Sequence, residues 1–559
     1  MNNTEHRRPL LPLILCATLL FALAFAVARP LLYSSAQTAS QAREPKAVEE
    51  KRETDNKQRD ASAKPTTTGP TTAASAIDTS PAALELVRKI DREIDAGEFS
   101  RARWGVFVMS LRDGRVLYAR NADHPITPAS NMKVYTTAVA LDLLGADYRW
   151  RTSVYASAPP DASGTIAGDL VLYGRGAPDF SSEKTKDASA SMAQLADALY
   201  RRGVRRVRGR IIGDESYFRG EPLGDGWLWN DVQWYFGAET SALSVNSNEV
   251  TVNIRPAGKA DARTSIKLEP ETDYVRIKDE TNVVESGQPA TLGITRGLSD
   301  NEVRVWGDFP VGGRSLSVRL SVHRPALWAA TLFHRMLSER GITIEGETHV
   351  RDALSQAEKD GFAPERAVEL ASVTGKSLGE IARSTNKESI NLSAELILRT
   401  LGKERGATVP DPKRMRERGD DEAGISVIRR WLEEAGIATG NLALHDGSGL
   451  SRLDLVTPEA TARLLVAIAR RPAYKVFRES LPIAGRDGTL KFRLRSAAAS
   501  RILAKTGTLS YINSLSGYAI TADDETLAFS IICNNDTAEA RATRPIDAIA
   551  TLLASYGEE

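Results

Sequence analysis

The sequence predicts an α/β (α+β) protein, in which one antiparallel sheet flanked by helices is interrupted by one or two inserted, mainly β domains. Three observations indicate this fold. Strand-like runs lie near both ends of the folded region, helical spacing dominates the stretch before the last strands, and residues 151–365 alternate short β-rich runs with Gly, Pro and Asp turns. Strands from both ends of a chain are expected to share one sheet that the intervening helices cover.

Residues 1–33 are predicted to be a targeting segment. Arg7 and Arg8 precede an apolar run over residues 9–28, and this run ends in Ala26-Val27-Ala28, a small-x-small sequence that suits a signal peptidase. The run is also long enough to span a bilayer. A cleaved signal peptide and a retained anchor both stay open, and both predict an extracytoplasmic protein, either periplasmic or tethered to the outer face of the inner membrane.

Residues 34–80 are predicted to be a disordered linker. They are rich in Ala, Thr, Ser, Lys, Glu and Pro and contain almost no large apolar residues, so they cannot bury a core. We expect residues 81–150 and 366–559 to form the main domain. Residues 151–365 are expected to form the inserted β-rich domain or domains.

The main domain is predicted to begin with a helix over residues 82–96, where Leu86, Ile90 and Ile94 follow helical spacing. Two strands follow, at residues 104–111 and 116–120, and an Asp-Gly turn joins them as a hairpin. A helix is expected over residues 130–144 because Gly145 provides its stop.

The inserted region is predicted to hold one helix, over residues 325–340. Its strand-like runs are short and bounded by turn residues; they lie at 169–173, 208–213, 249–254, 274–278, 302–306 and 315–322. Beyond the insertion, helical spacing returns in three stretches, at residues 377–402, 424–435 and 458–470. Three strands are then predicted at residues 501–505, 514–521 and 526–533, followed by a last helix at residues 538–555.

Composition excludes several functions. The formal net charge of the 559 residues is +1, which gives no electrostatic basis for nucleic-acid binding. The six histidines are scattered and none has zinc-ligand spacing, so no metal is predicted. Of the two cysteines, Cys16 lies in the targeting segment, and Cys533 is expected to be buried in a strand.

Ser130-Asn131-Met132-Lys133 is the first candidate for catalysis. Positions i and i+3 share a helix face, so the lysine amine can reach the serine hydroxyl and activate it as a nucleophile. Such a lysine acts as a base only if burial or a neighbouring cation, for which Lys505 is the candidate, lowers its pKa. A helix start with a surface lysine is the alternative interpretation. Two other Ser-x-x-Lys sequences, at Ser181 and Ser384, are not followed by a comparable apolar helix.

Lys505-Thr506-Gly507-Thr508 is the second candidate and ends a predicted strand. A glycine there would let a substrate backbone pack against the strand edge. Lys505 and Thr506 are expected to bind a carboxylate, and the Thr508 N–H is a candidate oxyanion donor. A lysine in an ordinary β-turn is the alternative.

A Ser-x-Asn sequence between these two motifs would complete the site. We favour Ser389-Ile390-Asn391, which comes directly before a good helix. Its serine could pass a proton to a leaving amine, and its asparagine could hold Lys133 and a substrate amide. Ser384–Asn386, only five residues earlier, stays open as a rival.

The three motifs, in this order, resemble the D-alanyl-D-alanine carboxypeptidase/endopeptidase family, the low-molecular-mass class C penicillin-binding proteins. The resemblance covers residues 81–556 and includes three further segments, Asp446-Gly447-Ser448-Gly449-Leu450-Ser451-Arg452, residues 481–490 and, in the inserted region, residues 241–248. The last segment makes Ser244–Asn246, a third Ser-x-Asn sequence, a structural feature and not part of the catalytic site. The resemblance implies a penicillin-binding/serine β-lactamase-like transpeptidase fold. Gly176-Ala177-Pro178-Asp179 departs from the family's pattern, within the insertion.

The resemblance implies a serine peptidase that acts on peptidoglycan stem peptides and forms an acyl-enzyme at Ser130. It implies that β-lactam antibiotics inhibit the enzyme covalently and that no cofactor is needed. Two alternatives share the fold. A class C-like β-lactamase would use Tyr-x-Asn as its middle motif, but Tyr511-Ile512-Asn513 follows Lys505 instead of preceding it. A non-catalytic wall-binding scaffold would not need complete motifs.

Overall fold

The computed structural model describes residues 76–184, 190–352, 363–407, 410–411, 416–417, 419–496, 498–537 and 542–557. The predicted targeting segment and all but residues 76–80 of the predicted linker lie outside these ranges. Within them, none of the helices is both long enough and apolar enough to span a bilayer.

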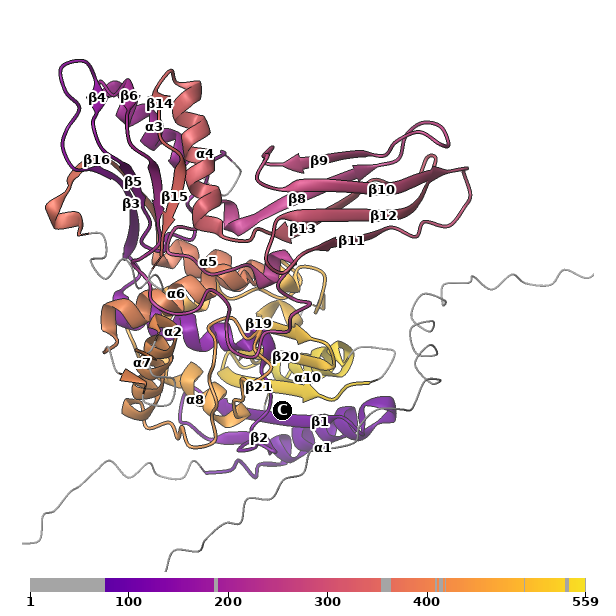
Figure 1. Cartoon of the computed structure of the whole chain (residues 1–559). Helices are drawn as coiled ribbons and strands as arrows, with labels where there is room; N and C mark the ends of the chain where they lie inside the picture. Colours follow the sequence, from indigo (N-terminus) through magenta and orange to yellow (C-terminus); the bar gives the residue numbers. More distant parts are fainter. Residues whose placement is uncertain are drawn as a thin grey trace, which may run out of the picture. The chain divides into compact units, whose positions relative to one another are not determined.

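The main domain contains a five-stranded sheet in the order β19-β20-β21-β1-β2. Every neighbouring pair is antiparallel. The strands from the start of the chain therefore lie beside those from its end, as the indigo and yellow strands of Figure 1 show. This confirms the predicted antiparallel sheet. The strands are β1 (Arg103–Ser110), β2 (Val116–Arg120), β19 (Ile502–Leu509), β20 (Ile512–Ile520) and β21 (Thr526–Asn534).

Two terminal helices share one hydrophobic core with this sheet. Helix α1 (Pro81–Asp95) contributes Leu86, Ile90 and Ile94, and α10 (Thr543–Ala554) packs against it. The N-terminus of α1 is capped by Ser80, whose hydroxyl accepts the N–H of Ala83 at 3.2 Å. Cys533 lies buried in β21 within the same core, as expected.

A second group of helices packs around α2 (Met132–Leu144). Residues 132–141 of α2 are all buried, so this helix is enclosed on every side instead of lying at the surface. Helix α8 (Pro458–Ala469) packs on β1 and β21 as well as on α2. The others around α2 are α5 (Leu378–Glu388), α6 (Asn391–Arg405), α7 (Asp420–Glu434) and α9 (Tyr474–Ser480).

The predicted helical stretch over residues 377–402 is two helices, because Ser389 adopts a left-handed conformation with φ of 59° and ends α5. Helix α6, which starts at Asn391, is the helix expected directly after the Ser389–Asn391 motif. The break places Ser389 and Asn391 at a helix junction, where side chains can face a shared cavity.

Strands between residues 149 and 377 form separate sheets in the described structure and share no strand with the five-stranded sheet. Strands β3 and β16 pair with each other at the two ends of this region. The larger sheet has the order β15-β7-β5-β3-β16, with β3 (Arg149–Ala156), β5 (Leu170–Tyr173), β7 (Ile211–Asp214), β15 (Thr348–Arg351) and β16 (Val368–Ser377).

The smaller sheets each have three strands. They are β14-β6-β4, β13-β8-β9 and β10-β12-β11, built from β4 (Thr165–Ile166), β6 (Arg206–Val207), β8 (Glu249–Arg255), β9 (Ser265–Glu269), β10 (Arg276–Val284), β11 (Gly293–Arg296), β12 (Glu302–Pro310), β13 (Leu316–Ser321) and β14 (Thr343–Ile344). A two-stranded pair, β17 (Pro410–Asp411) with β18 (Arg416–Glu417), lies later in the chain.

The inserted region holds α3 (Ser191–Arg201) in addition to the expected helix, which is α4 (Pro325–Glu339). The prediction of a single helix was therefore wrong. Met192, Leu195, Ala196 and Leu199 are all buried on one face of α3. Their spacing is the signal that could have found this helix.

Candidate active site

Ser130 and Lys133 lie in contact at the start of α2. Ser130 sits in a short 3-10 turn, η2 (Ala129–Asn131), and the α-helix proper begins at Met132. The Nζ atom of Lys133 lies 3.0 Å from Oγ of Ser130. Lys133 is fully buried, which excludes the alternative of a surface lysine.

Two further acceptors fix the lysine amine. Nζ of Lys133 donates to Oδ1 of Asn391 at 2.6 Å and to the carbonyl oxygen of Ser448 at 2.7 Å. The structure therefore brings the Ser-x-x-Lys motif and the asparagine of the Ser-x-Asn motif together around one atom.

The rival Ser384–Asn386 pair does not reach this atom. The Ser384 hydroxyl donates to a backbone carbonyl of its own helix, that of Ile381 at 2.9 Å. The Asn386 amide donates to Thr137 and Ser480 inside the helical core. Of the two candidate pairs, Ser389 and Asn391 are the ones placed at the site.

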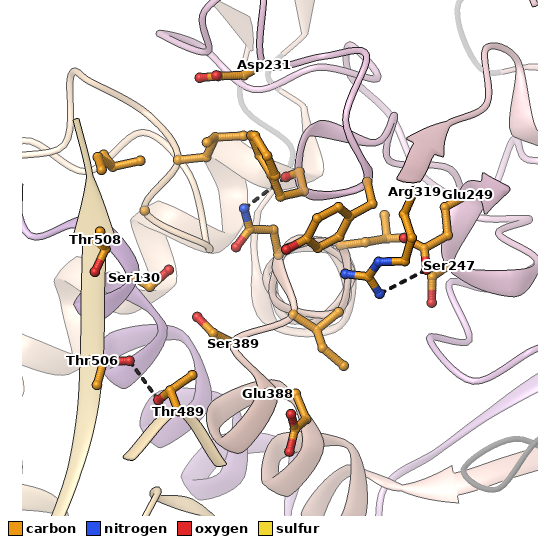
Figure 2. A pocket seen from close by; sticks show the side chains of 18 of the residues that line it. Ser130, Asp231, Ser247, Glu249, Arg319, Glu388, Ser389, Thr489, Thr506 and Thr508 are labelled. Carbon is orange, nitrogen blue, oxygen red and sulfur yellow. Dashed lines mark hydrogen bonds and ion pairs between the residues drawn. The ribbon is translucent and has the colours of Figure 1, made fainter. Parts of the chain in front are cut away.

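Residues 505–509 of β19 form an open strand edge beside Ser130. Strand β19 is an edge strand of its sheet. Residues 482–484 cover its first part, where the Ala504 N–H donates to the Pro482 carbonyl at 3.0 Å. Figure 2 shows Thr506 and Thr508 on this strand, with the hydroxyls of Ser130 and Ser389 facing the space beside it. A free edge of this kind can accept an added peptide strand.

Lys505 lies behind this edge and does not line the pocket. It is fully buried, and its Nζ atom donates to Oγ of Ser389 at 2.9 Å and to the carbonyl oxygen of Thr506 at 2.8 Å. Direct binding of a carboxylate by Lys505 stays a prediction, and in the structure its amine faces Ser389. Thr506 and Thr508 do line the pocket, and Oγ1 of Thr506 lies 2.7 Å from Oγ1 of Thr489.

Gly507 lies against the turn that carries Ser130, and its predicted role of letting a substrate backbone pack on the strand stays a prediction. A Cβ atom at this position would lie 2.7 Å from the Pro128 carbonyl oxygen and 3.1 Å from Cβ of Ala129. These atoms belong to the turn that carries Ser130. The glycine lets β19 approach the nucleophile's own turn, and it is this approach that sets Thr506 and Thr508 beside Ser130.

Burial controls the charge of both lysines. Desolvation lowers the pKa of Lys133 to about 8, and the charges of Asp446, Glu395 and Asp454 partly oppose this shift. Desolvation and then the charge of Lys133 hold the pKa of Lys505 well below its usual range. Burial is the first cause of the lowered pKa of Lys133, and repulsion between the two lysines also lowers the pKa of Lys505. That Lys505 helps to keep Lys133 neutral stays a prediction, because repulsion between two cations acts on both.

Acylation should consequently depend on pH through Lys133. Because the neutral amine is the form that can accept a proton, the second-order rate constant for acylation by penicillin should rise with pH and level off above a midpoint near pH 8. Stopped-flow or gel-based labelling across this range measures the rate constant. A rate constant that does not change through that midpoint would contradict a lysine base.

Glu395, whose buried carboxylate holds the loop at residues 447 and 448, was not identified from the sequence. Its carboxylate accepts the N–H of Gly447 at 3.1 Å and of Ser448 at 2.8 Å. Ser448 in turn supplies the carbonyl that holds Lys133. Glu395 lies one helical turn after Asn391 in α6, and this i, i+4 spacing is the signal that could have indicated it.

Asp446 holds the same loop from its other side. Its two carboxylate oxygens accept the N–H groups of Ser448, Gly449 and Ser451 and the indole N–H of Trp227, at 2.6–3.1 Å. Residues 446–452 therefore shape the site as a turn, as expected. Among the described residues, no group of three or more His, Cys, Asp or Glu side chains is arranged to hold a metal.

The pocket in front of these residues has a volume of about 690 Å³. Catalytic candidates line one part of it, and residues of the inserted region line another. The Asn391 amide joins the two parts, because its Nδ2 atom donates to the carbonyl oxygen of Phe236 at 2.9 Å.

A buried serine–lysine pair beside a free strand edge, within a helix-covered antiparallel sheet, defines a protein of the penicillin-binding, serine β-lactamase-like fold. Within this class, the chain belongs to the D-Ala-D-Ala carboxypeptidase 3 (S13) family, whose model matches residues 86–556. This confirms the family resemblance seen in the sequence.

Known relatives agree with this assignment. The D-alanyl-D-alanine carboxypeptidase of Actinomadura sp. (strain R39) is 34% identical over 487 residues, which cover 84% of this chain and 85% of the relative. Penicillin binding protein 4 (dacB) from Haemophilus influenzae has a similar crystal structure, with a TM-score of 0.70, 22% identity, and coverage of 84% of this chain and 97% of that chain. Its complex with a novel β-lactam gives a TM-score of 0.65 at 20% identity, covering 84% and 98% of the two chains. The two structures confirm the fold.

Proposed function

We propose that this protein is a serine-type D-Ala-D-Ala carboxypeptidase, and also a D-alanyl endopeptidase, which acts on peptidoglycan stem peptides through an acyl-enzyme at Ser130. One observation carries the proposal. The buried amine of Lys133 lies against Oγ of Ser130 and is held by two acceptors, Asn391 and the Ser448 carbonyl.

This arrangement orients the lone pair of the neutral Lys133 amine toward Ser130. When Nζ carries two hydrogens, Asn391 Oδ1 and the Ser448 carbonyl accept both, and the lone pair faces Ser130. Lys133 then takes the Ser130 proton as Oγ attacks the carbonyl between two D-alanines. The backbone N–H groups of Ser130 and Thr508 are the proposed donors to the oxyanion.

Ser389 and Lys505 serve the leaving group in this proposal. The Ser389 hydroxyl, held by Lys505, relays a proton: it donates its own hydrogen to the departing D-alanine nitrogen as the C–N bond breaks and receives the one that Lys133 took from Ser130. Water then attacks the ester of Ser130 and gives its proton to the neutral Lys133, which passes it to Oγ of Ser130 as the C–O bond breaks, so that the shortened peptide is released and the Ser130 hydroxyl is restored. A β-lactam would acylate Ser130 in the same way, but its leaving amine stays attached to the acyl group.

Thr506 is proposed to bind the terminal carboxylate through its hydroxyl, which pairs with that of Thr489. Thr506→Val should raise KM for substrates with a free terminal carboxylate roughly 10-fold, because a hydrogen bond to a charged group is lost. Steady-state assays with matched peptide acid and amide substrates measure this difference. An equal loss on the amide would remove this role from Thr506.

We also propose that the enzyme works outside the inner membrane, where peptidoglycan lies. The apolar run at residues 9–28, which follows Arg7 and Arg8, supports this location as a signal peptide or an anchor. The division into a main domain of residues 81–150 and 366–559 and an insertion of residues 151–365 is part of the same proposal. It is supported by the separate sheets of the insertion, which within the described ranges share no strand with the five-stranded sheet, and β16 extends the largest of these sheets to Ser377.

Mass spectrometry tests the proposed function. Purified protein is incubated with linear pentapeptide and cross-linked muropeptides, and separately with penicillin. We expect loss of D-alanine, cleavage of the cross-link, and a stable penicillin adduct on the peptide that contains Ser130. Rapid turnover of penicillin without muropeptide cleavage would instead indicate a β-lactamase. The absence of both adduct and cleavage would indicate a non-catalytic scaffold.

A further inference from the structure

The pocket has a second lobe on the side away from β19. Tyr235, Ser247, Glu249 and Arg319 line this part, which we call the Arg319 lobe. Figure 2 shows Arg319, Glu249 and Ser247 across the pocket from Thr506 and Thr508. None of these four residues takes part in the mechanism above, so the lobe needs a separate account.

Arg319 is held in place but retains free donors. Arg319 lies on β13, and Glu249 lies on the neighbouring strand β8. Glu249 pairs with Ser321, which is two residues after Arg319 on β13, so Arg319 and Glu249 lie on the same face of the sheet. Nη1 of Arg319 donates to Oε1 of Glu249 at 3.2 Å, and the guanidinium lies 3.6 Å from the centre of the Tyr235 ring. This is the one hydrogen bond made by Arg319 among the described residues, and the side chain is 46% exposed.

Ser247 projects from a strained turn in the same lobe. Asn246, Ser247 and Asn248 all have left-handed backbones, with φ of 49°, 56° and 55°. Hydrogen bonds hold the turn, such as the one from the Val245 N–H to Asn248 Oδ1 at 3.0 Å. Three consecutive left-handed residues cost free energy, and such strain is typically kept where it positions a functional group.

The lobe is directly connected to the catalytic residues. Tyr235 and Phe236 share the short helix η3 (Tyr235–Gly237), and the Phe236 carbonyl accepts the amide of Asn391. Asn391 also contacts Lys133. A ligand in the Arg319 lobe would therefore lie beside the wall of the active site and not at a remote surface.

The position of the lobe identifies the shape of its ligand. A linear peptide that adds to the edge of β19 lies about 4.8 Å from that strand. Such a peptide stays on the β19 side, so the opposite lobe is filled only by a group that branches from it, either a long side chain or a second peptide strand. A cross-linked stem peptide is branched, because its scissile amide joins two peptide strands, and both strands carry carboxylates that suit a guanidinium.

We propose that the Arg319 lobe binds a carboxylate of the second peptide strand of cross-linked substrates. Arg319 donates to the carboxylate, Ser247 adds a hydroxyl, and Glu249 with Tyr235 orients the guanidinium. This inference rests on the proposed function. It means that residues of the insertion determine how well cross-linked substrates bind relative to linear ones.

Arg319→Gln tests the proposal. The kcat/KM for a purified cross-linked dimer should fall about 10-fold or more, because a charge-assisted contact is lost. The kcat/KM for the linear pentapeptide and the rate of acylation by penicillin should change less than about 2-fold, as expected for a surface substitution that the linear substrate does not touch. Arg304→Gln is the matched control, because Arg304 also pairs with a glutamate, Glu280, and lies over an aromatic ring, that of Trp306, but does not line the pocket.

The outcomes separate this inference from the proposed function. Equal losses on linear and cross-linked substrates would overturn a second-strand site, as would an unchanged kcat/KM for the dimer. A wild-type enzyme that is acylated by penicillin and hydrolyses the pentapeptide but leaves the dimer intact would overturn it as well. In each of these cases the acyl-enzyme at Ser130 would still stand.

Discussion

Lys133→Ala should lower the rate of acylation by penicillin about 1,000-fold or more, which is the range expected when a general base is removed. The structure gives the reason. Lys133 is the one side-chain amine in contact with Oγ of Ser130 among the described residues, and its burial favours the neutral form that can accept a proton. Without it, the serine hydroxyl keeps its proton and reacts slowly.

The measurement is the second-order rate constant for a fluorescent penicillin, followed on gels or by mass. Lys133→Met keeps most of the buried volume and should show the same loss, which separates chemistry from packing. Lys184→Ala is the matched control, because Lys184 ends another Ser-x-x-Lys sequence and is exposed. Labelling of Lys133→Ala at the wild-type rate would contradict the proposed base.

The parts of the site that sequence could predict are those set by local spacing. Ser130 and Lys133 are three residues apart at the start of a helix, so their contact follows from helix geometry alone. The Lys-Thr-Gly sequence ends a strand-like run, and the structure places it on an open strand edge. The five-stranded sheet was predictable because strand signals stand at both ends of the folded region.

The missed features depend on contacts between distant segments. The requirement for Gly507 comes from the approach of β19 to residues 128 and 129, which no local pattern records. The burial that hides Lys505 behind Ser389 depends on how α5, α6 and β19 meet. The left-handed conformation of Ser389, which ends α5, has no glycine or proline to indicate it.

The charge states of the two lysines also depend on contacts between distant segments and not on local spacing. The sequence pairs the two lysines of the motifs and predicts that the charge of Lys505 helps to lower the pKa of Lys133. In the folded protein, the surroundings of Lys133 contain three buried carboxylates, and their charges act against the effect of burial. Burial and charge cannot be read from spacing, because they depend on which segments enclose the group.

Asp446→Ala should destabilise the protein and also slow acylation. Asp446 is buried and accepts three backbone N–H groups and the Trp227 indole. Leaving four buried donors without an acceptor costs on the order of 4 kcal/mol or more. The turn of residues 446–452 would then move, and the Ser448 carbonyl would no longer orient Lys133.

Thermal unfolding followed by circular dichroism should show a Tm several degrees below that of the wild type, and penicillin labelling well below this Tm should be at least about 10-fold slower.

Asp161→Ala is the matched control, because Asp161 also accepts backbone N–H groups, those of Ser163 and Thr165, but in an exposed turn. It should change neither measurement appreciably. A stable Asp446→Ala protein with wild-type labelling would show that the turn keeps its shape without this carboxylate. Slow labelling with an unchanged Tm would show instead that the carboxylate acts by orienting the Ser448 carbonyl, because loss of its charge lowers the pKa of Lys133 and would by itself favour the reactive neutral amine.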